Sequence, residues 1–354
     1  MSKNSFAGIL ILGFVLLVFG YIVRVSGSVE KSTDNSLSEN PKLVVGIVVD
    51  QMKYQYLTKF WNHYSDKGFK RLVNNGFTAK SNYYGYAQTS TGPGHTTVAT
   101  GTYPSIHGII GNNWYDKISK KSVYCVEDSR YETIGSDGDG GKKSPNRLLT
   151  STLSDENRIA TNFKGKTIGV AIKDRGAILS SGFTANAAYW YEGGEEGKFI
   201  TSSYYLDSMP DWVNTFNDSR IIDNYLIDWD TFYDISTYTE SGPDDNDFEN
   251  PFKGEKSPIF PHKIKDIATN NSNGKISYST LASTPFGNSL VADFSIEAIK
   301  GEELGLDNST DFLMIDFSST DYVGHQFGAN SKEVQDTYIR LDKEIERLLN
   351  FLDQ

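Results

Sequence analysis

Three runs of apolar residues predict strands that end near one another. They are residues 43–49 (LVVGIVV), 167–172 (TIGVAI) and 312–317 (FLMIDF). The first run is continuous and rich in β-branched residues, which is typical of a central strand buried on both faces of a parallel sheet. Each run leads directly into polar residues, namely Asp50, residues 173–175 (KDR) and residues 318–321 (SSTD). Because ligands gather at the carboxyl ends of strands in open α/β sheets, we expect these polar clusters to converge on one site.

Helical spacing of apolar residues predicts two long amphipathic segments. In residues 54–74 the apolar positions are Tyr56, Phe60, Tyr64, Phe69 and Leu72. In residues 333–352 they are Val334, Tyr338, Leu341, Ile345, Leu348 and Leu352. Strands that alternate with helices predict an α/β fold with a mostly parallel sheet flanked by helices. A helix in this alternation should feed another strand, so we expect the chain to be truncated at its C-terminus.

Composition changes along the chain and suggests an insertion. Residues 43–182 and 286–354 are expected to form the catalytic core, whereas residues 183–285 are rich in Tyr, Trp, Asp, Asn and Pro and have weak periodicity. We interpret residues 183–285 as an inserted cap. Two acidic stretches, residues 136–141 and 244–249, lack the ligand order of an EF-hand and are expected to be solvated loops.

The N-terminus predicts export from the cytoplasm. An apolar stretch at residues 6–23 follows Lys3 and precedes Arg24 and a polar segment. Its length lies between that of a signal-peptide core and that of a membrane-spanning helix. We therefore interpret residues 1–28 as a cleaved signal peptide or a retained anchor, and residues 29–42 as a linker. In either case the rest of the protein is expected to be periplasmic or otherwise extracytoplasmic, and to meet a membrane only through an uncleaved N-terminal segment.

Charge and cysteine content restrict the partners and the kind of metal site that the chain can have. The chain has 34 basic and 45 acidic residues, a net charge of -11, which disfavours nucleic-acid partners. Its single cysteine, Cys125, excludes an intrachain disulfide and a cysteine-based zinc site. A metal site must therefore use Asp, Glu, His or a hydroxyl, and the candidate histidines are His63, His95, His107, His262 and His325.

Thr91 is a candidate nucleophile. It opens the sequence TGPGH (residues 91–95) just before a short predicted helix, where free N–H groups and the helix dipole favour an anion. A threonine hydroxyl needs a nearby base or a metal to attack at neutral pH, and Asp50 is the natural metal ligand. Without the other motifs, residues 91–95 would indicate only a turn.

Other polar residues could complete a phosphate site. Asp321 and His325 are four residues apart, so on a helix they share a face and could bind one zinc, or simply hydrogen-bond to each other. Lys173 and Arg175 are two apart at a strand end, where extended geometry would point both side chains to one side as a clamp for a dianion. A solvated charged turn is the alternative. Asn112 could donate a hydrogen bond to the same phosphate.

In this order, the motifs resemble the alkaline phosphatase superfamily, specifically the phosphate-irrepressible alkaline phosphatases related to type I phosphodiesterases and nucleotide pyrophosphatases. The residues that carry the resemblance are 48–52 (VVDQM), 91–95 (TGPGH), 107–115 (HGIIGNNWY), 173–175 (KDR) and 319–325 (STDYVGH). The resemblance implies an alkaline phosphatase-like fold and a hydrolase that cleaves small phosphate monoesters through a phospho-threonine intermediate at a two-zinc site.

The resemblance also implies a role for each candidate residue. Asp50 and Thr91 would bind one zinc, and Asp321 and His325 would bind the second, which activates water. The phosphate oxygens would be held by Asn112, Lys173 and Arg175.

One departure from the family weakens the implied activity. The family completes its metal site with an Asp-His pair on the next strand and a further histidine, and this chain ends before either. We therefore expect the chain alone to bind zinc weakly and to have little or no activity. The alternatives are a phosphodiesterase or nucleotide pyrophosphatase, which would not need Lys173 and Arg175, and a non-catalytic binding fragment.

Overall fold

The predicted strands pair side by side in one sheet. The computed structural model describes residues 40–270 and 274–354, and its main sheet has six strands in the order β1-β8-β5-β6-β7-β4. These strands are β1 (Leu43–Val49), β4 (Thr133–Ile134), β5 (Thr167–Ala171), β6 (Ala187–Glu192), β7 (Lys198–Ser202) and β8 (Asp311–Phe317). In this order the neighbouring strands from β1 to β6 run parallel, whereas β7 is antiparallel to both of its neighbours, β6 and β4. The predicted fold class is thereby confirmed.

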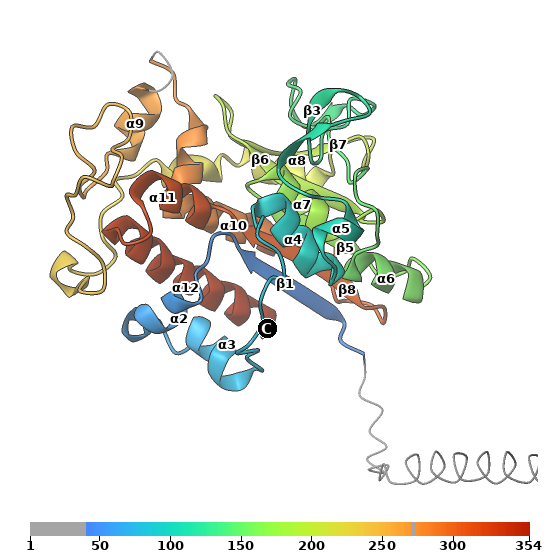
Figure 1. Cartoon of the computed structure of the whole chain (residues 1–354), viewed down its shortest axis with the longest axis horizontal. Helices are drawn as coiled ribbons and strands as arrows, with labels where there is room; N and C mark the ends of the chain where they lie inside the picture. Colours follow the sequence, from blue (N-terminus) through green and yellow to red (C-terminus); the bar gives the residue numbers. More distant parts are fainter. Residues whose placement is uncertain (1–39, 271–273) are drawn as a thin grey trace, which may run out of the picture. The chain divides into compact units, whose positions relative to one another are not determined.

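Helices cover both faces of this sheet. Each face of the sheet packs against its own hydrophobic core, because alternate side chains of a strand point to opposite faces. In β5, Ile168 and Val170 belong to one core and Ala171 belongs to the other. The first core is closed by α10 (Pro285–Gly301) and α12 (Lys332–Leu352), and the second by α7 (Asp174–Ser181). A further helix, α4 (Thr91–Thr100), packs on α7, so α4 and α7 lie across the sheet from α10 and α12 (Figure 1).

Shorter elements surround these layers. The remaining α-helices are α2 (Gln55–Lys59), α3 (Phe69–Asn75), α5 (Pro104–His107), α6 (Leu153–Ala160), α8 (Asp211–Asp218), α9 (Ile264–Asn270) and α11 (Ser319–Phe327). Strands β2 (Asn113–Asp116) and β3 (Lys121–Tyr124) form a separate antiparallel pair. Within the predicted insertion, residues 187–202 form β6 and β7 of the main sheet, and the residues after Ser202 lie outside it. The domain boundaries stay a prediction.

Strand β1 differs from its prediction as a fully buried central strand. Its seven residues are all partly exposed, and among the described strands it pairs only with β8. A continuous apolar run indicates a strand whose two faces both prefer to be covered, but it does not specify which strands lie beside it.

The first predicted helix is also interrupted. Instead of one helix over residues 54–74, the structure has α2, a 3-10 turn at Trp61–His63, and α3. The break is stabilised by Asp342 of α12, whose carboxylate accepts hydrogen bonds of 2.7 Å from the backbone N–H groups of Ser65 and Phe69. A Cβ atom on Gly68 would lie 2.2 Å from the same carboxylate, so only glycine fits there.

Replacing Asp342 with alanine is expected to destabilise the protein. Two backbone N–H groups would lose a charged acceptor in a largely buried place, which should lower the free energy of unfolding by about 2–4 kcal/mol. Urea denaturation followed by circular dichroism measures this. Asp66→Ala is the control, because the Asp66 side chain is 95% exposed. Equal stability of the two variants would contradict the proposed role of Asp342.

The predictions for the N-terminus are not addressed by the structure. Residues 1–28, interpreted as a signal peptide or anchor, and residues 29–39 of the linker lie outside the described residues. Over residues 40–270 and 274–354, no helix is both long enough and apolar enough to cross a membrane.

Candidate active site

A shared ion cluster joins the ends of three strands. Lys173 follows β5, and its Nζ lies 2.7 Å from Oδ2 of Asp50, which follows β1. The same ammonium also bonds to Oδ2 of Asp321, at the start of α11 after β8. Only 2% of the Lys173 side chain is exposed. The structure therefore brings residues from all three predicted polar clusters into contact.

Thr91 lies next to this cluster. It is the first residue of α4, and its hydroxyl donates a 3.0 Å hydrogen bond to Oδ2 of Asp50. Thr91 is buried, but it lines a cavity of about 310 Å³ together with Asp50, Gln51 and His95. A small molecule that enters this cavity can thus reach both the hydroxyl and the carboxylate.

The N-terminus of α4 offers fewer free N–H groups than predicted. The N–H of Gly92 donates to Oδ1 of Asn112 at 2.7 Å, Pro93 has no N–H, and the N–H of Gly94 bonds to the carbonyl of Ser90 at 2.9 Å. The sequence could not show that Asn112 folds back onto this turn. Because the carbonyl end of its amide faces Gly92, the NH₂ end of Asn112 is left to donate elsewhere.

His95 and Asp316 lie near Asp50, and the sequence assigned neither a role, although His95 was one of the candidate histidines. Asp50, His95 and Asp316 are all buried, and one ligating atom from each lies within 4.8 Å of the other two. Nε2 of His95 lies 3.2 Å from Oδ1 of Asp316, but neither atom has an aligned hydrogen bond. The available sequence signals were a histidine one helical turn after Thr91 and a carboxylate within an otherwise apolar strand.

The charges in this cluster reinforce one another. Burial alone would raise the pKa of Asp50, but His95 and Lys173 hold it below its usual value. Burial would likewise lower the pKa of Lys173, yet Asp50 and Asp321 raise it overall. The buried carboxylate of Asp50 and the partly buried carboxylate of Asp321 thus converge on the Lys173 ammonium. With oxygen and imidazole donors close by, these residues fit a divalent metal ion.

Lys173 and Arg175 do not form the extended clamp that their spacing suggested. The chain enters α7 immediately after Lys173, so Arg175 lies in the first helical turn and points to Tyr124. The guanidinium donates to the Tyr124 hydroxyl at 3.0 Å, and that hydroxyl donates to Asp174. Lys173 and Arg175 nevertheless line one cavity of about 320 Å³, together with Tyr322. Tyr124 is a further site residue that the sequence did not reveal.

Asp321 and His325 share one face of α11, as their spacing predicted. Nε2 of His325 lies 3.3 Å from Oδ1 of Asp321, and 74% of the His325 side chain is exposed. The side-chain amide of Gln51 donates to the same Asp321 oxygen at 2.9 Å. His325 is therefore placed at the open side of the cluster, where it can turn toward a ligand.

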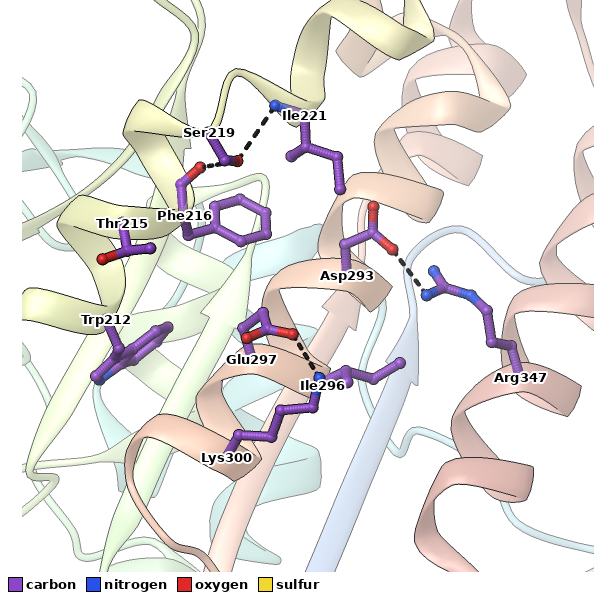
Figure 2. Close-up of a pocket in the computed structure, with 10 residues that line it drawn as sticks. All are labelled: Trp212, Thr215, Phe216, Ser219, Ile221, Asp293, Ile296, Glu297, Lys300 and Arg347. Carbon is purple, nitrogen blue, oxygen red and sulfur yellow. Dashed lines mark hydrogen bonds and ion pairs between the residues drawn. The ribbon is translucent and has the colours of Figure 1, made fainter.

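A cavity larger than the two at the candidate site lies elsewhere. It has a volume of about 590 Å³ and is lined mainly by residues of α8, α10 and α12 (Figure 2). Thr91 is not among its lining residues. Its charged residues neutralise each other, since Lys300 pairs with Glu297 at 2.6 Å and Arg347 pairs with Asp293 at 2.7 Å.

Known proteins are similar to most of this chain. Residues 44–354 match the family described as type I phosphodiesterase / nucleotide pyrophosphatase. Alkaline phosphatase PhoV of Synechococcus elongatus is 50% identical over 315 residues, and alkaline phosphatase PafA of Elizabethkingia meningoseptica is 42% identical over 335 residues. The crystal structure of wild-type PafA has a TM-score of 0.85 to this chain, at 42% identity, covering 88% of this chain and 59% of that one.

The chain is shorter than these relatives. The alignments cover 89% and 94% of this chain but 56% of PhoV and 60% of PafA. The comparison therefore bears on slightly more than half of each relative.

Proposed function

Because the chain belongs to the type I phosphodiesterase / nucleotide pyrophosphatase family, we propose that the protein hydrolyses small phosphate monoesters with Thr91 as its nucleophile. The observation that carries this proposal is the contact of the Thr91 hydroxyl with Asp50, which is itself bonded to Lys173. The names of the alkaline phosphatases PhoV and PafA support the same reaction.

Positive charge near Thr91 favours a monoester over a diester. In this structure Lys173 pairs with Asp50 and Asp321, and once those carboxylates are neutralised its ammonium is available to a phosphate. Arg175 lines the cavity of about 320 Å³ together with Lys173 and can offer a forked pair of N–H groups. Two cationic groups complement the second negative charge of a monoester, which a diester lacks.

The proposed chemistry proceeds in two steps at one phosphorus atom. Oxygen Oγ1 of Thr91 bonds to phosphorus while the bond to the alcohol oxygen breaks, and the alcohol leaves. Water then attacks the phosphothreonine, releases inorganic phosphate and restores the hydroxyl. Before the first step, Asp50 holds the hydroxyl by accepting its hydrogen bond, which fixes the direction of attack.

Metal binding is proposed at the carboxylates of this cluster. Asp50 with Thr91, and Asp321 with His325, would hold two zinc ions, and His95 and Asp316 are close enough to Asp50 to assist. Bound zinc would lower the pKa of a hydroxyl or water and neutralise phosphate charge. Each predicted pair supplies two of the four ligands that zinc usually takes. Each pair therefore needs further ligands to complete a zinc shell.

Substrate preference tests this proposal against its main alternative. The full-length protein, supplied with zinc, should hydrolyse p-nitrophenyl phosphate with a kcat/KM about tenfold or more above that for bis-p-nitrophenyl phosphate. The reverse preference would favour the phosphodiesterase alternative. No turnover of either ester, together with no bound zinc, would favour a non-catalytic binding protein.

A change at Tyr124 should weaken phosphate binding without removing the nucleophile. Tyr124→Phe deletes the hydroxyl that fixes Arg175, so KM for the monoester is expected to rise about 3- to 10-fold with a smaller change in kcat. Inhibition by inorganic phosphate should weaken by a similar factor. Tyr131→Phe is the control, because Tyr131 packs on Tyr204 and lines neither cavity of the site. Equal KM values for the two variants would contradict this role of Tyr124.

We also infer that the protein acts outside the cytoplasm. The support is the apolar stretch at residues 6–23 between Lys3 and Arg24. Fractionation of the native host and N-terminal sequencing of the mature protein would test export and cleavage.

A further inference from the structure

The cavity of about 320 Å³ beside Lys173 holds one more cation than the proposed phosphate contacts use. Lys143 lines it together with Lys173 and Arg175, and the acidic residues on its wall are Asp174 and Glu192. Once the carboxylates that pair with Lys173 are neutralised, positive charge exceeds negative charge on this wall. In a chain with a net charge of -11, such a place is a candidate site for anions.

The ammonium of Lys143 is free to bind a ligand. In residues 40–270 and 274–354 it makes two contacts, an ion pair of 3.6 Å with Oδ2 of Asp174 and a contact of 4.9 Å with the centre of the Tyr124 ring. The first is too long for a hydrogen bond, and a ring has no oxygen or nitrogen acceptor at its centre. The three N–H donors of this ammonium can therefore turn to the oxygens of an anion.

The backbone fixes Lys143 in the cavity wall. Its carbonyl accepts a 2.7 Å hydrogen bond from the hydroxyl of Ser202 in β7, and its N–H donates to the carbonyl of Gly141 at 2.7 Å. The N–H of the next residue, Ser144, donates to the carbonyl of Val126 at 2.9 Å. With 20% of its side chain exposed, Lys143 is part of a built wall and not of a free surface loop.

Tyr124 places Lys143 beside the proposed phosphate contact Arg175. The Lys143 ammonium lies over the face of the Tyr124 ring, and the hydroxyl of that ring accepts a 3.0 Å hydrogen bond from the Arg175 guanidinium. The two cations are thus neighbours along one tyrosine side chain. Each can engage a different anionic group of the same molecule.

We infer that this cavity selects phosphate monoesters whose alcohol carries a second anionic group, a carboxylate or another phosphate, and that Lys143 binds this second group. The inference rests on the proposed function, in which Lys173 and Arg175 hold the phosphoryl group that is transferred. A second anion at Lys143 would then belong to the leaving alcohol. An ester with a neutral alcohol offers this ammonium no charged partner and should bind more weakly.

Binding to Thr91→Ala protein tests the subsite without turnover. Two three-carbon esters form a matched pair, since 3-phosphoglycerate has a carboxylate where glycerol 3-phosphate has a hydroxymethyl group. Isothermal titration calorimetry of the full-length, zinc-supplied protein should give a Kd about fivefold or more lower for 3-phosphoglycerate. Adding Lys143→Met, or Lys143→Gln as a second neutral variant, should bring the two Kd values within about twofold of each other. Because both esters are measured on one protein, a general loss of affinity cancels in this ratio.

A second matched pair distinguishes the two kinds of anion. Fructose 1,6-bisphosphate and fructose 6-phosphate differ by one phosphate, and a preference that depends on Lys143 in either pair supports the subsite and identifies the group that it binds. Lys142→Met is the control, because Lys142 pairs with Asp139 at 2.9 Å and does not line the cavity, so it should keep the wild-type preference. No preference in either pair, or a preference that survives both Lys143 variants, would overturn the subsite.

Hydrolysis of p-nitrophenyl phosphate by the wild type separates this inference from the proposed function. Turnover of that ester without a preference for the second anion means that only the subsite fails. A Lys143-dependent preference without turnover means that only the proposed function fails.

Discussion

Thr91→Ala is expected to lower kcat for phosphate monoesters by at least about 10³-fold, because the variant has no oxygen to attack phosphorus. The methyl side chain should leave the fold intact, since only the hydroxyl contacts Asp50 and the backbone of α4 is unchanged. Steady-state hydrolysis of p-nitrophenyl phosphate by the full-length, zinc-supplied protein measures the effect.

Thr91→Ser is the matched control for this prediction. Serine restores a hydroxyl at the first position of α4, so the variant should retain activity well above that of Thr91→Ala. If Thr91→Ala retains wild-type activity, Thr91 only positions other groups. If Thr91→Ser is as inactive as Thr91→Ala, the hydroxyl alone does not explain the loss.

Lys173→Met is expected to destabilise the metal-free protein strongly. The Lys173 ammonium is the cation shared by Asp50 and Asp321, whose side chains are only 10% and 15% exposed. Methionine keeps most of the volume but leaves two partly buried carboxylates facing each other, which should lower the free energy of unfolding by about 3–5 kcal/mol. Denaturation in the presence of a chelator measures this loss.

A divalent cation should partly reverse the effect of Lys173→Met. Zinc added to the variant should raise its thermal midpoint more than it raises that of the wild type, because it replaces a missing positive charge. Lys142→Met, at an exposed pair with Asp139, serves as the control and should change stability little. A Lys173→Met variant as stable as the control would contradict the shared ion cluster.

The main elements of the fold could be predicted because they depend on local patterns. Strands β1, β5 and β8 each come from one continuous apolar run. The apolar stripe of α12 comes from residues at helical spacing within one segment. The interruption between α2 and α3 could not be predicted, since it depends on Asp342, which is distant in the sequence. Among the described strands β1 lies at the edge of the sheet. This position was missed for a similar reason, because a strand's own residues do not identify its neighbours.

The residues of the candidate site likewise divide into those that local sequence patterns predicted and those that they did not. Asp50, Lys173 and Asp321 could be identified as candidates because each stands in a polar motif after an apolar run, and Thr91 because it opens the sequence TGPGH before a short predicted helix. The roles of His95, Asp316 and Tyr124 arise only from contacts between segments far apart in the chain. The free N–H groups expected at Thr91 were overestimated, because Asn112 satisfies one of them. The sequence thus indicated which residues carry chemistry in each local motif, whereas contacts between residues of distant segments could be found only in the structure.

A covalent intermediate on Thr91 is the central claim, and trapping it is the most direct test. The full-length protein would be mixed with a monoester, quenched in acid and digested, and the peptides analysed by mass spectrometry. The account predicts one phosphate group on the peptide that contains residues 91–95, located at Thr91 and absent from Thr91→Ala. Active protein that carries phosphate on another residue, or on none across conditions that slow the second step, would contradict it.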